Sequence, residues 1–466
     1  MFMSGREALA IQVLDETGDP VAGVAVMDGD RTLSTTDATG TTTVEWTRSL
    51  DEFSLEAAGF EPKSVDVRSR PDGGVVVRIE ARYLRGEIVD PDGRPIAGVY
   101  VKSGFGESVT DRSGAFKVRR AESGMVSVWR PAWSLGDFDW DGSPGKRTIS
   151  IAPMVAKAVH VTAEIAGNRT LWSQAIDRVM TTELNAMMLD LKGEAGLVLY
   201  DSQVELARSI NAVVPQYDLP LLARQLADLD IYLIGRIVAF QDPTAAVRMP
   251  EMAVRNSSSG QPYSKGGQYF LDPTDLEARG YALALAEEAC TLGVDEIQFD
   301  YVRYPDGFSG VAVFDGGSDE AARVGAIQSF LAEARSILHP LGCAVAGDIF
   351  GFITTALDDG GIGQQWEVVA AALDVVSPML YPSHYNDGWY GFDKPNDHPG
   401  PMIERALRDA VRRLETGTVI RPWLQDFGYT ADQVRAQIDS TEAYGFGWML
   451  WNFRGNVTEG ALKPER

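Results

Sequence analysis

Cysteine and histidine are scarce in this chain of 466 residues, and this excludes several kinds of site. The chain has only two cysteines, too few for a disulfide framework or a cysteine-rich zinc site. Its four histidines, His160, His339, His384 and His398, lack the paired spacing of a metal-binding helix. Phosphate-loop, dinucleotide and serine-elbow motifs are also missing. We therefore expect neither a metal nor a cofactor.

The two cysteines, Cys290 and Cys343, each lie close to the start of a predicted strand. Cys290 ends the preceding helix, and Cys343 takes the first position of its own strand. A disulfide would require these two strands to be neighbours. Because buried cysteines commonly pack as small hydrophobic residues, the sequence favours two free thiols over a bridge.

Long apolar runs and excess positive charge are also absent. No stretch of 18 apolar residues predicts a transmembrane helix. Acidic residues number 66 and basic residues 42, and the net charge of -24 repels nucleic acid and anionic lipid. The N-terminal sequence lacks the features of a signal peptide. Two locations stay open: extracellular or cell-surface, with an export segment missing from this chain, and cytoplasmic.

One pattern occurs twice in the first third of the chain. From Ile11 and again from Gly86, a strand is followed by Asp-x-x-Gly, Pro-x-x-Gly-Val and Thr-Asp-x-x-Gly. Alternating apolar residues between these turns predict short antiparallel strands, and hence two small all-β sandwich modules over residues 7–80 and 81–152. The pattern resembles carboxypeptidase-regulatory-like or transthyretin-like modules. Nothing in it indicates catalysis.

From about residue 155, strand-like runs alternate with amphipathic helical patterns. This alternation over about 300 residues predicts a (β/α)8 TIM barrel spanning residues 155–456. A doubly wound open sheet is less favoured, because no glycine-rich phosphate loop follows a strand. The eight expected strands cover residues 158–164, 185–191, 231–240, 295–302, 343–351, 374–382, 419–427 and 445–453.

The fourth expected strand carries polar residues where a buried strand would be apolar. In "GVDEIQFDYVRYP", Glu296, Gln298 and Asp300 alternate and therefore share one face. We expect Glu296 and Gln298 to form a buried, hydrogen-bonded layer beneath Asp300. Catalytic groups of such barrels lie at the C-terminal ends of the strands, where Asp300 is placed.

Six stretches resemble a family of bacterial TIM-barrel glycoside hydrolases long described as a domain of unknown function. They are "GRIVAFQDP", "GVDEIQFDYVRYP", "GDIFG", "SPMLYPSHY", "IRPWLQDF" and "GWMLWN". The resemblance implies a glycosidase, in which the carboxylate that ends strand four, here Asp300, is commonly the nucleophile. We expect Asp300 to be the nucleophile or key carboxylate of a hydrolase that cleaves a polysaccharide or cell-wall glycan. The resemblance implies no particular sugar or linkage, and the oligomeric state is not predicted.

Glycoside hydrolysis requires a second carboxyl group, and two candidates stay open. Asp348 ends the neighbouring strand, close enough for a retaining enzyme, whereas Asp426 lies three strands away and suggests inversion. Either Arg236 or Arg303 would keep Asp300 ionised. The predicted substrate-binding residues are Asp190, Lys192, Arg236, Arg303, Tyr381, His384, Gln425, Trp451 and Asn452. The alternative is a carbohydrate-binding or scaffolding protein with a degenerate, inactive barrel.

Overall fold

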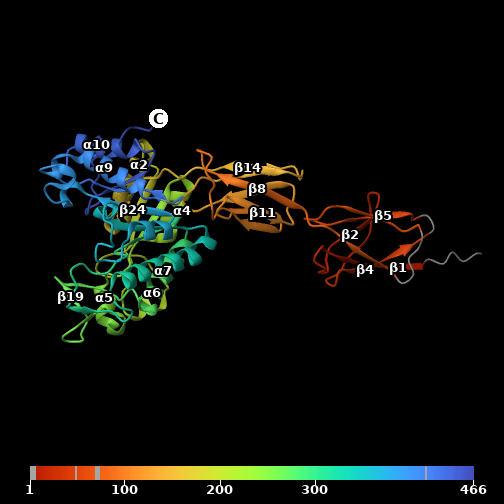
Figure 1. Cartoon of the computed structure of the whole chain (residues 1–466), viewed down its shortest axis with the longest axis horizontal. Helices are drawn as coiled ribbons and strands as arrows, with labels where there is room; N and C mark the ends of the chain where they lie inside the picture. The colour runs from red at the N-terminus through yellow and green to blue at the C-terminus, as the bar shows by residue number, and fades with distance from the viewer. Residues whose placement is uncertain (1–6, 48–49, 69–73, 415–416, 466) are drawn as a thin grey trace, which may run out of the picture. The chain divides into compact units, whose positions relative to one another are not determined.

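A computed structural model describes residues 7–47, 50–68, 74–414 and 417–465 of the chain. The chain forms two compact units, Met1–Pro153 and Met154–Arg466 (Figure 1). The first unit consists of short strands, and the second alternates strands with helices. The predicted multidomain architecture, small β modules followed by a barrel, is confirmed.

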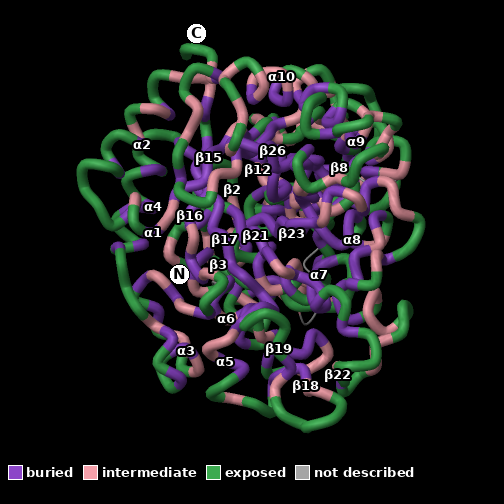
Figure 2. The backbone as a smooth tube through the Cα atoms, turned by 90° about the vertical axis from the view of Figure 1, so that its left-hand side faces the viewer, coloured by how far each residue is buried: buried purple, intermediate pink, exposed green. Residues whose placement is uncertain are grey.

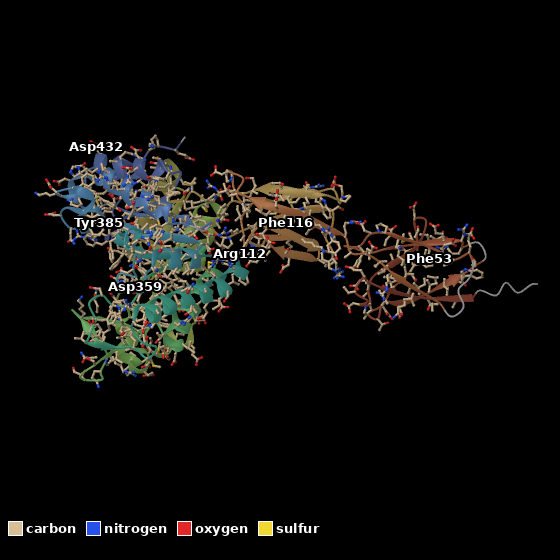
Figure 3. All side chains as sticks on the ribbon, viewed as in Figure 1. Phe53, Arg112, Phe116, Asp359, Tyr385 and Asp432 are labelled. Atoms are coloured by element: carbon tan, nitrogen blue, oxygen red, sulfur yellow. A yellow bond between two sulfur atoms is a disulfide. The ribbon has the colours of Figure 1, made fainter. Side chains whose placement is uncertain are left out.

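The first unit contains the same arrangement of sheets twice. Each half has a three-stranded sheet, in the order β4-β1-β7 or β11-β8-β14, and a four-stranded sheet, in the order β3-β2-β5-β6 or β10-β9-β12-β13. Phe53 and Phe116, labelled in Figure 3, are core residues of the two halves. Not every pair is antiparallel as expected, because β7 and β14 join their sheets in parallel. The strands are β1 (Glu7–Leu14), β2 (Ala25–Asp28), β3 (Arg31–Thr35), β4 (Thr41–Trp46), β5 (Glu52–Glu56), β6 (Lys63–Asp66), β7 (Val75–Arg78), β8 (Tyr83–Val89), β9 (Tyr100–Ser103), β10 (Gly106–Val109), β11 (Ala115–Arg119), β12 (Gly124–Trp129), β13 (Phe138–Trp140) and β14 (Lys146–Ser150).

The second unit is a closed barrel of parallel strands. The ring closes because β23 pairs with both β21 and β24, while β27 pairs with both β15 and β26. Its seventh strand is interrupted before Pro422, which has no N–H to donate to a neighbour. The strands are β15 (Lys157–Val161), β16 (Ala186–Lys192), β17 (Tyr232–Val238), β21 (Glu296–Asp300), β23 (Ala344–Phe350), β24 (Val375–Leu380), β25 (Val419–Ile420) with β26 (Trp423–Gln425), and β27 (Trp448–Trp451).

Helices cover the outside of the barrel, and the strands form its buried centre (Figure 2). Several helices begin at a side chain that accepts a backbone N–H, including Asp275, Asp319 and Thr430. No helix among the described residues is long and apolar enough to cross a membrane. The helices are α1 (Ala163–Gly167), α2 (Arg169–Thr181), α3 (Glu205–Ser209), α4 (Leu219–Asp228), α5 (Pro243–Arg248), α6 (Leu276–Thr291), α7 (Glu320–Leu338), α8 (Trp366–Ala372), α9 (Pro399–Arg412) and α10 (Ala431–Glu442).

Two long loops, after β17 and after β21, carry short strands of their own. β18 (Arg255–Asn256) in the first loop pairs with β22 (Ala312–Val313) in the second. β19 (Ser264–Lys265) and β20 (Gln268–Tyr269) form a hairpin in the first loop. The two loops are therefore tied together by backbone hydrogen bonds beside the C-terminal end of strand β21.

The expectation of two free thiols was wrong, because Cys290 and Cys343 form a disulfide. Cys290 lies at the end of α6, just before β21, and Cys343 lies just before β23. Since β21 and β23 are neighbours, the residues that precede them meet at the N-terminal end of the barrel. The predicted barrel already made these two strands neighbours, so the error lay in treating the two cysteines as buried free thiols.

Replacing both cysteines with serine is expected to lower the free energy of unfolding. The bond links residues 53 positions apart, and a cross-link of this span typically contributes about 2 to 4 kcal/mol. Urea unfolding of the parent and the double variant measures the difference. Reductant should bring the parent down to the stability of the variant and leave the variant unchanged. Equal stability of parent and variant without reductant would contradict the prediction.

Candidate active site

A cavity of about 510 Å³ opens at the C-terminal ends of the barrel strands. This is the end at which barrels of this kind carry their reactive groups. Its walls combine carboxylates, two guanidinium groups and many aromatic rings. The lining residues are Glu194, Arg236, Asp300, Tyr301, Arg303, Asp348, Phe350, Gly351, Phe352, Met379, Tyr381, His384, Tyr385, Trp423 and Trp451.

Asp300, the last residue of β21, is held against Arg236 of the neighbouring strand β17. The Nε and Nη2 atoms of Arg236 both donate to Asp300 Oδ2, at 3.0 and 2.5 Å. The backbone N–H of Tyr301 donates to Asp300 Oδ1 at 2.7 Å. Tyr301 has a φ of 50°, a left-handed conformation that is costly for a bulky residue and is often found at functional sites. Charge-assisted hydrogen bonds to both oxygens fix the Asp300 carboxylate in place.

Arg236 also binds two further carboxylates. Its Nη1 donates to Asp190 Oδ1 at 2.8 Å, and its Nη2 donates to Glu194 Oε1. Burial opposes the charge of this guanidinium, but Asp300, Asp190 and Glu194 together raise the pKa of Arg236 well above its usual value. For the same reason the pKa of Asp190 and that of Glu194 are lowered, since Arg236, with His160 at Asp190, outweighs the effect of burial. Arg236 is therefore cationic, and the charged forms of Asp190 and Glu194 are favoured.

Asp348, on β23, has a raised pKa, whereas the pKa values of Asp190 and Glu194 are lowered. Burial, followed by the negative charge of Asp300, raises the pKa of Asp348 well above its ordinary range. Its Oδ1 accepts hydrogen bonds from Trp423 Nε1, at 2.6 Å, and from Gln298 Nε2. The side chain of Asp348 is only 2% exposed, yet it forms part of the cavity wall. The neutral form of Asp348 is thus favoured over its ionised form more than in an ordinary carboxyl group.

The polar layer expected beneath Asp300 is confirmed. Glu296 and Gln298 are fully buried inside the barrel. Glu296 accepts from Arg421 on the seventh strand and from the hydroxyl of Tyr232. Gln298 donates to Asp348, as described above. These polar residues on strand four are therefore explained by partners that support the floor of the cavity.

Aromatic rings and a second arginine form the remaining cavity wall. Arg303 lies 4.6 Å from the ring centroid of Phe350, and burial lowers the pKa of Arg303. His384 contacts the Tyr381 ring at 5.3 Å, and partial burial lowers the pKa of His384. The hydroxyl of Tyr385, labelled in Figure 3, has no hydrogen-bond partner among the described residues. Rings with nearby polar groups suit a ligand with both apolar faces and hydroxyl groups.

Seven of the twelve predicted site residues line this cavity, whereas Asp190 and four others do not. Lys192 is buried in an ion pair with Asp242, 2.8 Å away, and is not paired with Asp190. Gln425 accepts from the backbone of Ser383 and donates to that of Phe427. The other two, Asp426 and Asn452, bond to the local backbone, Asp426 to Thr458 N and Asn452 to Asp426 O.

Asp190 does not line the cavity either, but it contacts Arg236, which does. The prediction missed Glu194, which ion-pairs with Arg236 and lines the cavity. The only indication of Glu194 in the sequence was its position just after the second predicted strand. Within the described residues, no group of three or more His, Cys, Asp or Glu side chains is placed to hold a metal ion.

Fold and site together define a barrel of the glycosidase type, with carboxyl groups facing an aromatic cavity. A family described as "Putative glycosyl hydrolase domain" matches residues 158–456. This match covers well over half of the chain, and the protein belongs to this family of glycosyl hydrolases. None of the curated proteins compared with the chain matches it.

Several solved structures are similar to parts of the chain. A hypothetical protein from Ruminiclostridium thermocellum is 31% identical, covering 40% of this chain and 96% of its own, with a TM-score of 0.38. The glycoside hydrolase domain of PgaB from Bordetella bronchiseptica is 13% identical, covering 65% and 95%, with a TM-score of 0.49. The glycoside hydrolase domain of PelA from Pseudomonas aeruginosa is 12% identical, covering 65% and 96%, with a TM-score of 0.41.

Replacing Arg236 with methionine is expected to destabilise the barrel strongly at neutral pH. Removing one partner of a buried ion pair typically costs about 3 to 5 kcal/mol, because a charge is left uncompensated. Since Arg236 lowers the pKa of Asp190 and Glu194, its stabilisation is present above their unfolded pKa values and is lost as the pH falls through the lowered folded values. The deficit should therefore shrink below about pH 4, where the unfolded carboxyl groups protonate.

Denaturant unfolding of the Arg236→Met variant at pH 7 and at pH 3 measures this dependence. Arg208→Met is the matched control, because Arg208 pairs with Asp201 on the surface, where both side chains are largely exposed. It should cost no more than about 1 kcal/mol at either pH. A deficit in Arg236→Met that is equal at both pH values would show that lost packing, and not charge, causes the destabilisation.

Proposed function

We propose that the protein is a glycoside hydrolase that cleaves a polysaccharide or cell-wall glycan with Asp300 and Asp348 as its two carboxyl groups. The observation that carries the proposal is the contrast between these residues. They lie on neighbouring strands and face one cavity, yet one is paired with a guanidinium and the other has a raised pKa. Glycosidic cleavage needs one carboxylate and one carboxylic acid.

Asp300 takes the role of the carboxylate. It accepts two hydrogen bonds from Arg236 and one from the backbone. These bonds fix its orientation toward the cavity. An ionised and immobilised carboxylate can attack the anomeric carbon directly, or it can activate a water molecule for that attack.

Asp348 takes the role of the acid. Both of its internal hydrogen bonds come from N–H donors and reach Oδ1, so Oδ1 accepts and the proton resides on Oδ2. A dry environment raises the proton affinity of a carboxyl group, as a general acid requires at neutral pH. Asp348 can therefore donate a proton to the oxygen of the leaving sugar.

The aromatic lining supports a carbohydrate as the substrate. Sugar rings present C–H faces that pack on aromatic side chains, and the cavity offers Trp451, Tyr381 and Tyr385 for such contacts. Hydroxyl groups of the sugar can be held by Arg303 and His384, which line the same cavity. We therefore extend the proposal to these five residues as the substrate-binding set.

We also propose that the protein works outside the cytoplasm, in the extracellular space or at the cell surface. Disulfides persist in oxidising compartments and are rare in the cytosol. The bond between Cys290 and Cys343 supports this location. Thiol labelling of the protein taken from its native cells, under denaturing conditions, tests it. Two labelled thiols in the native protein would exclude the proposed location.

Conservative substitution of either proposed catalytic residue is expected to abolish glycan cleavage. Asp300→Asn and Asp348→Asn keep the size of the side chain but remove the carboxylate and the acid, respectively. We expect kcat to fall at least 1,000-fold in each, roughly the loss that follows removal of an essential catalytic group. The measurement is release of reducing ends from a panel of bacterial and plant polysaccharides.

Asp426→Asn is the matched control in the same assay. Asp426 was the alternative second carboxyl group, and its pKa is also raised by burial, but it does not line the cavity. This variant should keep the kcat of the parent. Loss of activity in Asp426→Asn together with retention in Asp348→Asn would overturn the assignment of the acid. Glycan binding by the parent with no cleavage of any glycan would favour the alternative, a carbohydrate-binding protein with an inactive barrel.

The pH profile of cleavage should depend on the proton of Asp348. Activity should fall as the pH rises through the raised pKa of this acid, which gives the alkaline limb of a plot of kcat/KM against pH. Trp423→Phe removes the N–H that stabilises the ionised form of Asp348. The alkaline limb should therefore move to higher pH in Trp423→Phe. A limb at unchanged pH would mean that another group supplies the proton.

A further inference from the structure

A histidine and an aspartate on the two preceding strands lie behind Arg236. His160 on β15, Asp190 on β16 and Arg236 on β17 form a continuous row of contacts across three neighbouring strands. His160 Nε2 lies 2.8 Å from Asp190 Oδ2, and Arg236 Nη1 lies 2.8 Å from Asp190 Oδ1. Neither His160 nor Asp190 lines the cavity. Their side chains reach Asp300 only through Arg236.

Both ring nitrogens of His160 face acceptors. Nδ1 lies 2.8 Å from the backbone carbonyl oxygen of Asn452, which can only accept. Nε2 faces Asp190, whose pKa is lowered by His160 and Arg236 in spite of burial. The Asp190 carboxylate is thus held between the His160 ring and the Arg236 guanidinium.

This arrangement leaves the Asp190 side chain with no freedom to turn. One of its oxygens is used by His160 and the other by Arg236, so rotation would break a charge-assisted hydrogen bond. Because a guanidinium is planar, fixing Nη1 also fixes the direction in which Nε and Nη2 donate. Both of these atoms donate to Asp300. Trp451 adds a further restraint, since its ring stacks on His160 at 4.4 Å and lies 5.2 Å from Arg236.

We propose that Asp190 and His160 are positioning residues. They hold the Arg236 guanidinium in the orientation in which it donates two hydrogen bonds to Asp300. The inference rests on the proposed function, because it assigns the catalytic carboxylate to Asp300. It goes beyond that function in giving the buried pair a role in turnover, not only in stability. The sequence predicted that Asp190 binds substrate. In the proposed role Asp190 instead binds Arg236, which in turn binds the reacting carboxylate of Asp300.

The chain contains a natural control for this idea at the other end of the barrel. Asp374, just before β24, is fully buried and pairs with His339 at 2.7 Å and with Arg335 at 3.4 Å. The residue types are the same as in the row of His160, Asp190 and Arg236. The Asp374 cluster lies at the N-terminal ends of the strands and lines no part of the cavity. Removing its charge should therefore affect folding without affecting turnover.

The test compares Asp190→Asn with Asp374→Asn in the full-length protein. Both variants should unfold at a lower temperature than the parent. In Asp190→Asn we expect kcat to fall about 10- to 100-fold, the range for a lost hydrogen bond to a charged group, with KM changed less than twofold. In Asp374→Asn both constants should match those of the parent. His160→Gln, whose amide can still donate to Asp190, should lose less activity than His160→Phe.

A second measurement does not depend on activity. In protein labelled with ¹⁵N, the Nε–H of Arg236, identified by its loss in Arg236→Lys, should exchange slowly with water because it is buried and donates to Asp300. Exchange should become faster in Asp190→Asn and stay unchanged in Asp374→Asn. Exchange could be faster in Asp190→Asn than in the parent although the parent cleaves no glycan. That result would support the positioning role and reject the proposed function.

Two outcomes would overturn the inference. One is an Asp190→Asn variant with the kcat and the Arg236 exchange rate of the parent. The other is an equal loss of kcat in Asp190→Asn and Asp374→Asn that follows only the loss of folded protein. Either result would leave His160 and Asp190 as a stabilising pair like that at Asp374.

Discussion

The guanidinium of Arg236 is the interaction on which the charged centre of the barrel depends. It is almost fully buried and binds Asp190, Glu194 and Asp300, which come from two strands and a loop. A charge so far from water is tolerated only when it is paired and hydrogen-bonded. Three carboxylates around one guanidinium leave a negative excess. A fourth carboxylate beside them would be costly, which is a physical reason for Asp348 to keep its proton.

Parallel strands explain why these groups meet. Asp190 is in register with Arg236, Asp300 ends the next strand, and Asp348 lies on the strand after that. The N-terminal end of the same barrel also carries buried ion pairs, such as that between Glu296 and Arg421, together with the disulfide. Neither Glu296 nor Arg421 lines the cavity at the C-terminal end. Similar chemistry therefore stabilises one end of the barrel and places two carboxyl groups in the cavity wall at the other.

The fold was largely predictable from the sequence because each βα unit carries its own local pattern. The alternation of Glu296, Gln298 and Asp300 also fixed the face of strand four, since a regular strand turns every second residue to the same side. The same rule failed for Lys192, because the pairing register shifts between Asp190 and Lys192. A bulge of this kind turns the next side chain to the other face, and here Lys192 meets Asp242 outside the cavity.

Residues on loops and the partners of individual side chains could not be predicted in this way. Glu194 has no strand periodicity to give its direction, and neighbouring strands permit a disulfide without requiring one. Gln425 and Asp426 were both predicted at the site because they end the seventh strand. In the structure neither side chain lines the cavity, because both bond to nearby backbone. The sequence thus predicted which strand ends surround the cavity better than it predicted which side chains line it.

Trp423 belongs to the aromatic wall of the cavity and also contacts Asp348, the proposed acid. The same side chain that lines the cavity donates its N–H to Asp348, so a ligand packed on this wall lies beside the proposed proton donor. A bound sugar would also displace water from the cavity, and loss of water further favours the neutral form of a carboxyl group. Asp348 would then hold its proton most firmly when a glycosidic oxygen is present to receive it. Asp300, with its charge matched by Arg236, would stay ionised in the same complex.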